Sequence, residues 1–260
     1  MNKNNFKMLK FLNKEFSKNK SAQSLTTLVL SGNNLKSIKF LVKTKFNQMI
    51  FSNLKHLDLS RNNLGDENIK YIEKFNCINL EKLYLYTNMF TDYTIFNMIN
   101  EKFKNLEEFY IGFNRFEKNS NEINEDITFE KLKRIGLNYV FNEYNYKNLG
   151  KFKLENLEQL YIQHNGISNL DIIEKMKLFK IKELYLINNE FDEIDVNFLI
   201  QFPYLERIYL DNSVSRIINF DKIQALTNFK YFDFDNIKID IEIIKEKGPN
   251  FIKDLEIILN

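Results

Sequence analysis

The sequence contains little of what stabilises small secreted proteins or spans membranes. It has one cysteine, Cys77, in 260 residues, so no disulfide can form within the chain. No apolar run reaches the roughly 18 residues that a transmembrane helix requires. Because secreted domains depend on disulfides, their absence indicates a reducing compartment, and we expect a cytoplasmic protein with no membrane span.

An excess of charge of one sign is also missing. Lys and Arg total 37 against 35 Asp and Glu, which gives a formal net charge of +2. Nucleic-acid-binding domains are usually strongly basic, so this balance argues against a nucleic-acid partner.

Residues for catalysis or metal binding are scarce. The two histidines, His56 and His164, lie far apart in the sequence, and Cys77 has no second cysteine with which to form a Cys/His metal cluster. Glycine-rich phosphate loops of the form GxxxxGK[ST] are absent. We therefore predict that the protein is not an enzyme and holds neither a cofactor nor a metal ion.

What the sequence does contain is one phrase repeated along most of its length. It reads LTTLVLSGNNL from Leu25, LKHLDLSRNNL from Leu54 and LEEFYIGFNRF from Leu106. Copies begin at residues 25, 54, 80, 106, 132, 157, 181, 205, 229 and 252, so their spacing falls from 29 to 23 residues. A period in this range indicates a solenoid of stacked units, and the falling spacing predicts helices that give way to tighter turns.

These copies resemble the leucine-rich-repeat family, in its intracellular type, whose motif is LxxLxLxxNxL. The resemblance covers Leu25 to Asn260. It implies an α/β solenoid, a horseshoe with a concave parallel β-sheet of about ten strands and with helices or turns on the convex side. It does not identify a partner, because the family binds many unrelated ones. We divide the chain into an N-terminal segment, residues 1–24, and a repeat array, residues 25–260.

The alternation of side chains within each copy supports this fold independently. Leu57 and Leu59, two residues apart on a strand, point to one face and should form the core. At the ninth position, where the chain should turn sharply, an asparagine side chain can satisfy backbone groups. Seven units carry it, as Asn33, Asn62, Asn88, Asn114, Asn165, Asn189 and Asn260. Val140, Ser213 and Ile237 replace it elsewhere, and we expect differently shaped turns there.

The residues between the two core leucines should face outward on the concave side. Five of the 13 tyrosines occupy this column, and four further aromatic residues flank it. Aromatic residues are enriched at binding hot spots, which favours a binding role, whereas tyrosines that pack on one another across the strands are the alternative. The predicted partner-binding residues are Tyr84, Tyr86, Tyr110, Phe113, Tyr139, Tyr161, Tyr185, Tyr209 and Tyr231.

Both ends of the chain depart from the regular repeat. Residues 1–24 combine an apolar stripe with lysines, which predicts a helical cap over the core of the first unit. A basic helix at a membrane surface, or a targeting peptide, is the alternative. At the other end, an open strand edge at the copy from residue 252 would serve self-association or the docking of another chain.

These observations predict a non-catalytic scaffold or adaptor that binds a protein partner through the concave sheet. Charges of both signs beside the tyrosines suit a protein surface better than a phosphate backbone. The alternative is a fixed structural subunit of a large cytoskeletal, ciliary or ribonucleoprotein assembly. A surface or secreted recognition protein would predict a signal peptide and cysteine caps, and the sequence displays neither.

Overall fold

The computed structural model describes residues 25–42, 51–116, 122–211, 214, 216–234 and 237–248. The cap predicted at 1–24, the copy at 252 and Asn260 therefore lie outside the described residues. The chain divides into two compact units, Met1–Asn121 and Glu122–Asn260, which we call unit 1 and unit 2.

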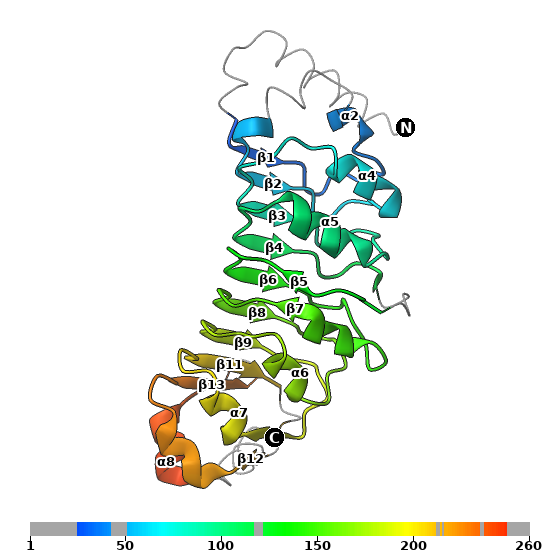
Figure 1. The fold of residues 1–260 in the computed structure, drawn as a ribbon. Coiled ribbons are helices and arrows are strands. Elements are labelled where there is room, and N and C mark those ends of the chain that lie inside the picture. The colour runs from blue at the N-terminus through cyan, green and yellow to red at the C-terminus, as the bar shows by residue number, and fades with distance from the viewer. Residues whose placement is uncertain are drawn as a thin grey trace. The chain divides into compact units, whose positions relative to one another are not determined.

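Unit 1 contains four short parallel strands, one from each of the first four copies of the repeat. They are β1 (Thr27–Val29), β2 (His56–Asp58), β3 (Lys82–Tyr84) and β4 (Glu108–Tyr110), shown in Figure 1. Each strand pairs in register with the next, so that Leu57 lies between Leu28 and Leu83. Equivalent positions of the motif therefore form columns across the sheet.

Helices α2 (Lys39–Val42), α4 (Ile69–Ile72) and α5 (Thr94–Lys102) lie on the side of unit 1 opposite the strands (Figure 1). Two short 3-10 segments, η2 (Phe51–Asn53) and η3 (Asp66–Asn68), complete the described helical part of the unit. Helix α5 buries Ile95, Phe96 and Ile99, which recur at helical spacing. The Phe96 ring centre lies 5.5 Å from that of Phe116 and 6.2 Å from that of Phe109 on β4. The core thus connects the helix directly to the sheet.

Unit 2 repeats the pattern and ends differently from the expectation. Five strands pair in parallel and in sequence order: β6 (Arg134–Gly136), β8 (Gln159–Tyr161), β9 (Glu183–Tyr185), β11 (Arg207–Leu210) and β13 (Tyr231–Phe234). The next strand, β14 (Ile237–Asp240), pairs antiparallel with β13 and leads into α8 (Ile241–Lys247). Within the described residues, the sheet therefore ends on a hairpin strand and not on a parallel strand from the copy at 252.

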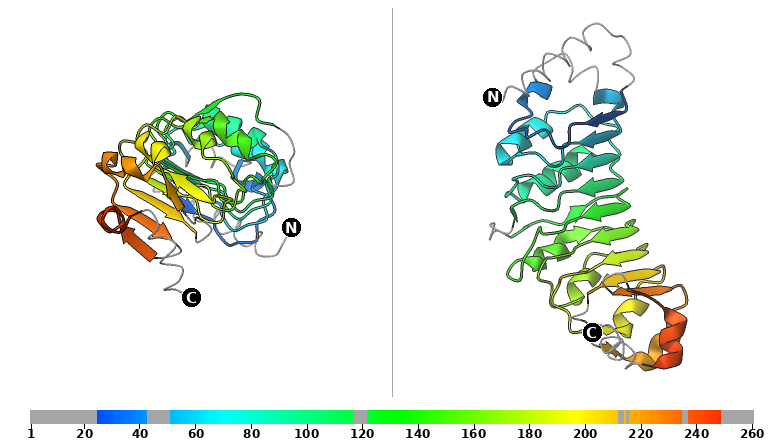
Figure 2. Two further views of the ribbon diagram at one scale, coloured as in Figure 1. Left: turned by 90° about the horizontal axis from the view of Figure 1, so that it is seen from below. Right: turned by 180° about the vertical axis from the view of Figure 1, so that it is seen from behind.

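The rest of unit 2 consists of short helical segments and two small pairs of strands, which are coloured from green to orange in Figure 2. The helical segments are η5 (Tyr146–Lys151), α6 (Asp171–Glu174), α7 (Val196–Ile200) and η6 (Phe220–Ala225). Two small parallel pairs join β5 (Ile127–Thr128) to β7 (Phe152–Lys153) and β10 (Glu193–Asp195) to β12 (Arg216–Ile218). The falling spacing does not shorten the helices steadily: α5 is the longest described helix with nine residues, but α2 and α4 in the longer repeats have four each, fewer than α7 with five.

The leucine-type positions of the motif form the core of each unit, as predicted. Leu57, Leu59, Leu83 and Leu85 are fully buried in unit 1, and Leu184 is fully buried in unit 2. One unit of the repeat cannot bury these residues alone, so stacking provides the stability. None of the helices formed by the described residues has the length and apolarity needed to cross a membrane.

Candidate functional site

In seven copies of the repeat, the strand is followed by a turn that contains a residue in the left-handed backbone conformation. It stands at the eighth position of the motif, as Gly32, Arg61, Thr87, Phe113, Tyr139, His164 and Asn188, with φ between 52° and 70°. This conformation is uncommon outside glycine, so the surrounding contacts must hold it in place. Tyr139 precedes Val140 and shares the conformation, with φ of 54°. The expectation of a differently shaped turn at Val140 is therefore wrong at this residue.

The asparagine that follows holds the turn by bonding to two successive copies. The Asn62 amide donates to the carbonyl of Leu30 (2.9 Å) in the preceding copy and to that of Leu59 (3.0 Å) in its own. Its oxygen accepts the N–H of Leu35 at 2.9 Å. Equivalent bonds are made by Asn88, Asn114, Asn165 and Asn189, all buried, whereas Asn33 is exposed and its amide bonds within its own copy. The stacked amides fix the spacing of the copies.

At Val140 the turn still receives the bonds that the asparagine of the next copy makes in the other turns. The Asn165 oxygen accepts the N–H groups of Val140 (2.9 Å) and Phe141 (2.7 Å). Its amide donates to the carbonyl of Leu137 at 3.0 Å. Because these bonds come from the following copy, a buried apolar residue fits at this position.

A second column of asparagines, at the start of the strands, escaped the sequence analysis. Asn79 donates to the carbonyl of Ser52 and Asn105 to that of Ile78, both at 2.8 Å. Asn156 and Asn228 donate in the same way to the carbonyls of Glu130 and Pro203, both at 2.7 Å. These asparagines directly precede the first apolar position of the motif, a sequence signal that lies just outside LxxLxLxxNxL.

The side chains of the strands that point away from the core form a surface that we call the open sheet face. In unit 1, Tyr84 lies at its centre, with ring centres 4.8 Å from His56, 5.3 Å from Tyr110 and 6.5 Å from Tyr86. The Tyr84 hydroxyl donates to Glu108 at 2.7 Å, and the Lys82 ammonium lies 2.8 Å from the same carboxylate. The pKa of His56 is lowered, chiefly by burial. This part of the face is therefore a cluster of contacting rings beside an ion pair.

In unit 2, three tyrosines of the column stack face to face. The ring centres of Tyr161 and Tyr185 are 4.1 Å apart, and those of Tyr185 and Tyr209 are 4.0 Å apart, with interplanar angles of 17° and 5°. The Tyr185 hydroxyl donates to Glu183 at 2.7 Å. Burial raises the pKa of Tyr185 well above its usual range, and hydrogen bonds with Tyr209 and Glu183 act in the same direction. The Tyr185 hydroxyl therefore stays protonated at neutral pH.

Other aromatic residues of the predicted set flank this stack. Tyr139 is 42% exposed and stacks on His164 with ring centres 4.1 Å apart. Tyr231 has two cations near its ring, the Arg207 guanidinium 5.5 Å and the Lys238 ammonium 3.4 Å from its ring centre. The sequence analysis did not predict these particular pairings, because the side chains meet only when the copies stack.

The predicted residues fall into separate groups. The structure brings Tyr84, Tyr86 and Tyr110 together in unit 1, and Tyr161, Tyr185 and Tyr209 together in unit 2. Phe113 and Tyr139 lie on the turns that follow the strands, and Phe113 is 47% exposed. Glu108 and His164, which contact these rings, occupy outward positions of the same motif.

The chemistry of the described residues offers little for catalysis. Burial raises the pKa of the Cys77 thiol to about 12, so the nucleophilic thiolate is almost absent at neutral pH. Nowhere in the described part of the chain do three or more His, Cys, Asp or Glu side chains gather as metal ligands.

Comparisons with known proteins agree with this architecture. A leucine-rich-repeat family model matches residues 52–72. The structure is similar to an internalin of Listeria monocytogenes, with a TM-score of 0.57 and 16% identity over 88% of this chain and 68% of that one. A leucine-rich-repeat protein of Leptospira interrogans gives a TM-score of 0.50 and 21% identity over 82% and 55% of the two chains. No curated protein matches the sequence.

A receptor solved as a complex with single-stranded RNA, TLR13, is also similar in fold. Its TM-score is 0.53 with 21% identity, over 82% of this chain and 29% of the receptor. The present chain therefore spans only part of the length of these neighbours.

Stacked parallel strands, buried leucine columns and bonded asparagines together define a leucine-rich-repeat solenoid. The chain has the leucine-rich-repeat fold, and residues 52–72 match a leucine-rich-repeat family model. Its fold is that of an interaction scaffold in general, and the fold itself identifies no partner.

Proposed function

We propose that this protein is a non-catalytic scaffold or adaptor that acts in the cytoplasm and binds another protein through the open sheet face. The observation that carries the proposal is the tyrosine column, whose rings are half-buried and held against one another in each unit. The single cysteine supports a reducing compartment.

The stacked tyrosines suit binding because they are already ordered. Association costs free energy for each side chain that it immobilises, and a ring fixed by its neighbours has little freedom left to lose. Tyrosine also combines a large apolar body with a polar hydroxyl, a composition enriched at interfaces. Packing of the rings on one another therefore prepares the face for a partner, so the two interpretations of the column are compatible.

Charges on the open sheet face favour a protein of mixed charge as the partner. In unit 1 the Lys82 ammonium is paired with Glu108. In unit 2 Gln159 bonds to Glu183 and receives a bond from Arg134. A phosphate backbone would require a surplus of unpaired cations, which these pairings reduce.

The test compares two sets of tyrosines in affinity capture from native lysate. The first variant combines Tyr161→Ala, Tyr185→Ala and Tyr209→Ala, which removes the stack. The matched control combines Tyr71→Ala, Tyr144→Ala and Tyr204→Ala, three tyrosines outside the open sheet face, of which Tyr144 is 85% exposed. Circular dichroism verifies that both variants fold.

We expect the first variant to lose a protein that the wild type and the control both retain. Direct titration of that purified protein should then show at least a tenfold weaker affinity, since hot-spot residues each contribute about 2 kcal/mol or more. An identical set of captured proteins for a folded first variant would contradict the proposal. Salt-resistant co-sedimentation with one large complex would instead favour the structural-subunit alternative.

A further inference from the structure

We propose that unit 2 binds a phosphate-bearing ligand in a lysine-lined hollow, independently of the open sheet face. The hollow lies between η5 and α6 and has a volume of about 430 Å³. Small-molecule sites typically range from about 300 to 1,000 Å³. A compact phosphorylated molecule or headgroup therefore fits this space.

Four lysines line the hollow, and two carboxylates only partly balance them. Lys147 and Lys151 come from η5, Lys153 from β7 and Lys175 from the end of α6, whereas the acids are Asp126 and Asp171. Like charges gathered around a concave surface repel one another and concentrate oppositely charged ligands. The surplus of cations therefore favours an anion.

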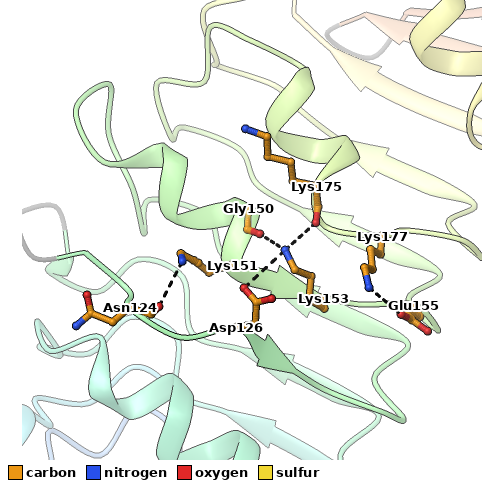
Figure 3. Close-up of polar contacts among 8 residues, drawn as sticks. All are labelled: Asn124, Asp126, Gly150, Lys151, Lys153, Glu155, Lys175 and Lys177. Atoms are coloured by element: carbon orange, nitrogen blue, oxygen red, sulfur yellow. Dashed lines mark hydrogen bonds and ion pairs between the residues drawn. The ribbon is translucent and has the colours of Figure 1, made fainter.

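The two inner lysines are fixed in place by the fold, as Figure 3 shows. The Lys153 ammonium donates to the carbonyls of Gly150 and Lys175, the latter at 3.0 Å, and lies 3.8 Å from the Asp126 carboxylate. Lys151 donates to the carbonyl of Asn124 at 3.3 Å. Neutral carbonyls accept most of these bonds, so the positive charge is held in place but largely not cancelled.

The two outer lysines can close on a ligand. Lys147 and Lys175 are exposed, and within the described residues neither ammonium group makes a hydrogen bond or an ion pair. The Lys175 side chain extends away from the Lys153 ammonium in Figure 3. An ammonium group on a flexible stem is a common ligand for phosphate oxygens.

The remaining lining supports a small ligand at this place. Ile172 contributes an apolar floor, and a methyl group added at Gly150 would come within 2.9 Å of its terminal carbon, so η5 and α6 approach closely there. Tyr146 also lines the hollow, and its hydroxyl lies 3.3 Å from that of Ser168. The Tyr146 hydroxyl can bond to a phosphate oxygen.

A neighbouring hollow of opposite charge confines an anion to the lysine side. It has a volume of about 490 Å³, and its acidic lining residues are Asp171, Glu174, Glu190, Asp192, Glu193 and Asp195. Helix α6 contributes residues to both hollows. Phosphate is repelled by this acidic lining, so a phosphorylated ligand should occupy the lysine-lined hollow alone.

The experiment titrates the full chain with inorganic tripolyphosphate by calorimetry and measures its co-sedimentation with vesicles. The vesicles contain phosphatidylcholine with and without phosphatidylinositol phosphate. Variants Lys147→Gln and Lys175→Gln remove the outer charges, and Lys180→Gln is the matched control, because Lys180 is also exposed and does not line the hollow. Thermal unfolding verifies that each variant keeps the stability of the wild type.

We expect saturable binding that Lys147→Gln and Lys175→Gln each weaken by about tenfold, while Lys180→Gln leaves it unchanged. Binding of tripolyphosphate alone identifies a soluble phosphate ligand, and lysine-dependent binding of phosphoinositide vesicles identifies a lipid headgroup. Added salt should weaken both. The proposal is overturned if neither probe binds, or if binding is equally strong in the outer-lysine variants.

Discussion

The two units place tyrosines at the same motif position, yet their rings meet in different geometries. Tyr84 and Tyr110 in unit 1 lie edge to face, at 83° and 5.3 Å, whereas Tyr185 and Tyr209 in unit 2 are stacked, at 5° and 4.0 Å. The residues to which the tyrosine hydroxyl groups donate also differ between the two units. Tyr84 bonds across to Glu108 on the next strand, and Tyr185 bonds to Glu183 on its own strand.

This comparison distinguishes which tyrosines become neighbours from how their rings are oriented. The register of the sheet decides which tyrosines become neighbours, because it aligns equivalent positions of the motif. The ring orientation differs together with the position of the carboxylate: Tyr84 bonds across to the next strand, and Tyr185 bonds within its own strand.

The largest expected effect compares the helical sides of the two units. Phe96→Ala in α5 should cost about 4 kcal/mol of unfolding free energy, since Phe96 is fully buried against Phe109 and Phe116. Phe198→Ala in the shorter α7 should cost about 3 kcal/mol, because Phe198 is slightly exposed and contacts Phe202. Urea unfolding followed by circular dichroism measures both. A greater loss for Phe198→Ala would reverse this ranking.

The next effect tests the asparagine column of unit 1. Asn88→Ala should cost about 2 kcal/mol, because it leaves the buried N–H of Leu64 without its partner. It also removes one of the two amide bonds that the carbonyls of Leu59 and Leu85 each accept, the others coming from Asn62 and Asn114. Asn33→Ala is the matched control and should cost less than about 1 kcal/mol, since Asn33 is exposed and water can replace its bonds. Equal losses in urea unfolding would show that burial does not determine the contribution of these amides.

A smaller effect tests the hydroxyl bonds directly. Tyr84→Phe should cost about 1.5 kcal/mol, because Glu108 is nearly buried and would lose one of its bonds. Tyr185→Phe should cost about 0.5 kcal/mol, because Glu183 keeps its bond from Gln159. Chemical unfolding measures the stability, and near-ultraviolet circular dichroism follows the rings. We expect the signal of the stack to persist in Tyr185→Phe; its loss would mean that the hydroxyl bond, and not the register, maintains the stacking.

The smallest effect is the dependence of stability on pH, to which the one histidine of each unit contributes. Burial lowers the pKa values of both His56 and His164 below 6.5. A lowered pKa means that the unfolded chain binds protons first as the pH falls. The stability from the neutral imidazoles is therefore fully present above pH 6.5 and is lost as the pH falls from 6.5 through the lowered values.

Single variants apportion this pH dependence between the units. His56→Gln and His164→Gln should each flatten the decline in melting temperature between neutral and mildly acidic pH. A decline equally steep in the double variant would assign the effect to other groups.

The sequence by itself determined which residues form the core and which form the columns. Leu57, Leu59 and their equivalents recur at fixed intervals, and alternation along a strand places them on one face whatever the neighbours are. The repeated tyrosines and asparagines follow from the same periodicity. These features depend on local geometry and on one period, both of which can be obtained from the chain alone.

Only the tertiary structure decided how these residues meet. It kept the turn at Val140 through Asn165 of the next copy, and it ended the described sheet on the antiparallel strand β14. It also chose stacking for Tyr185 and edge contact for Tyr84, and it gathered the lysines around the hollow beside α6. The reason is physical: each of these contacts joins side chains from different segments of the chain, and their distances are set by how the copies stack rather than by the sequence of any one copy.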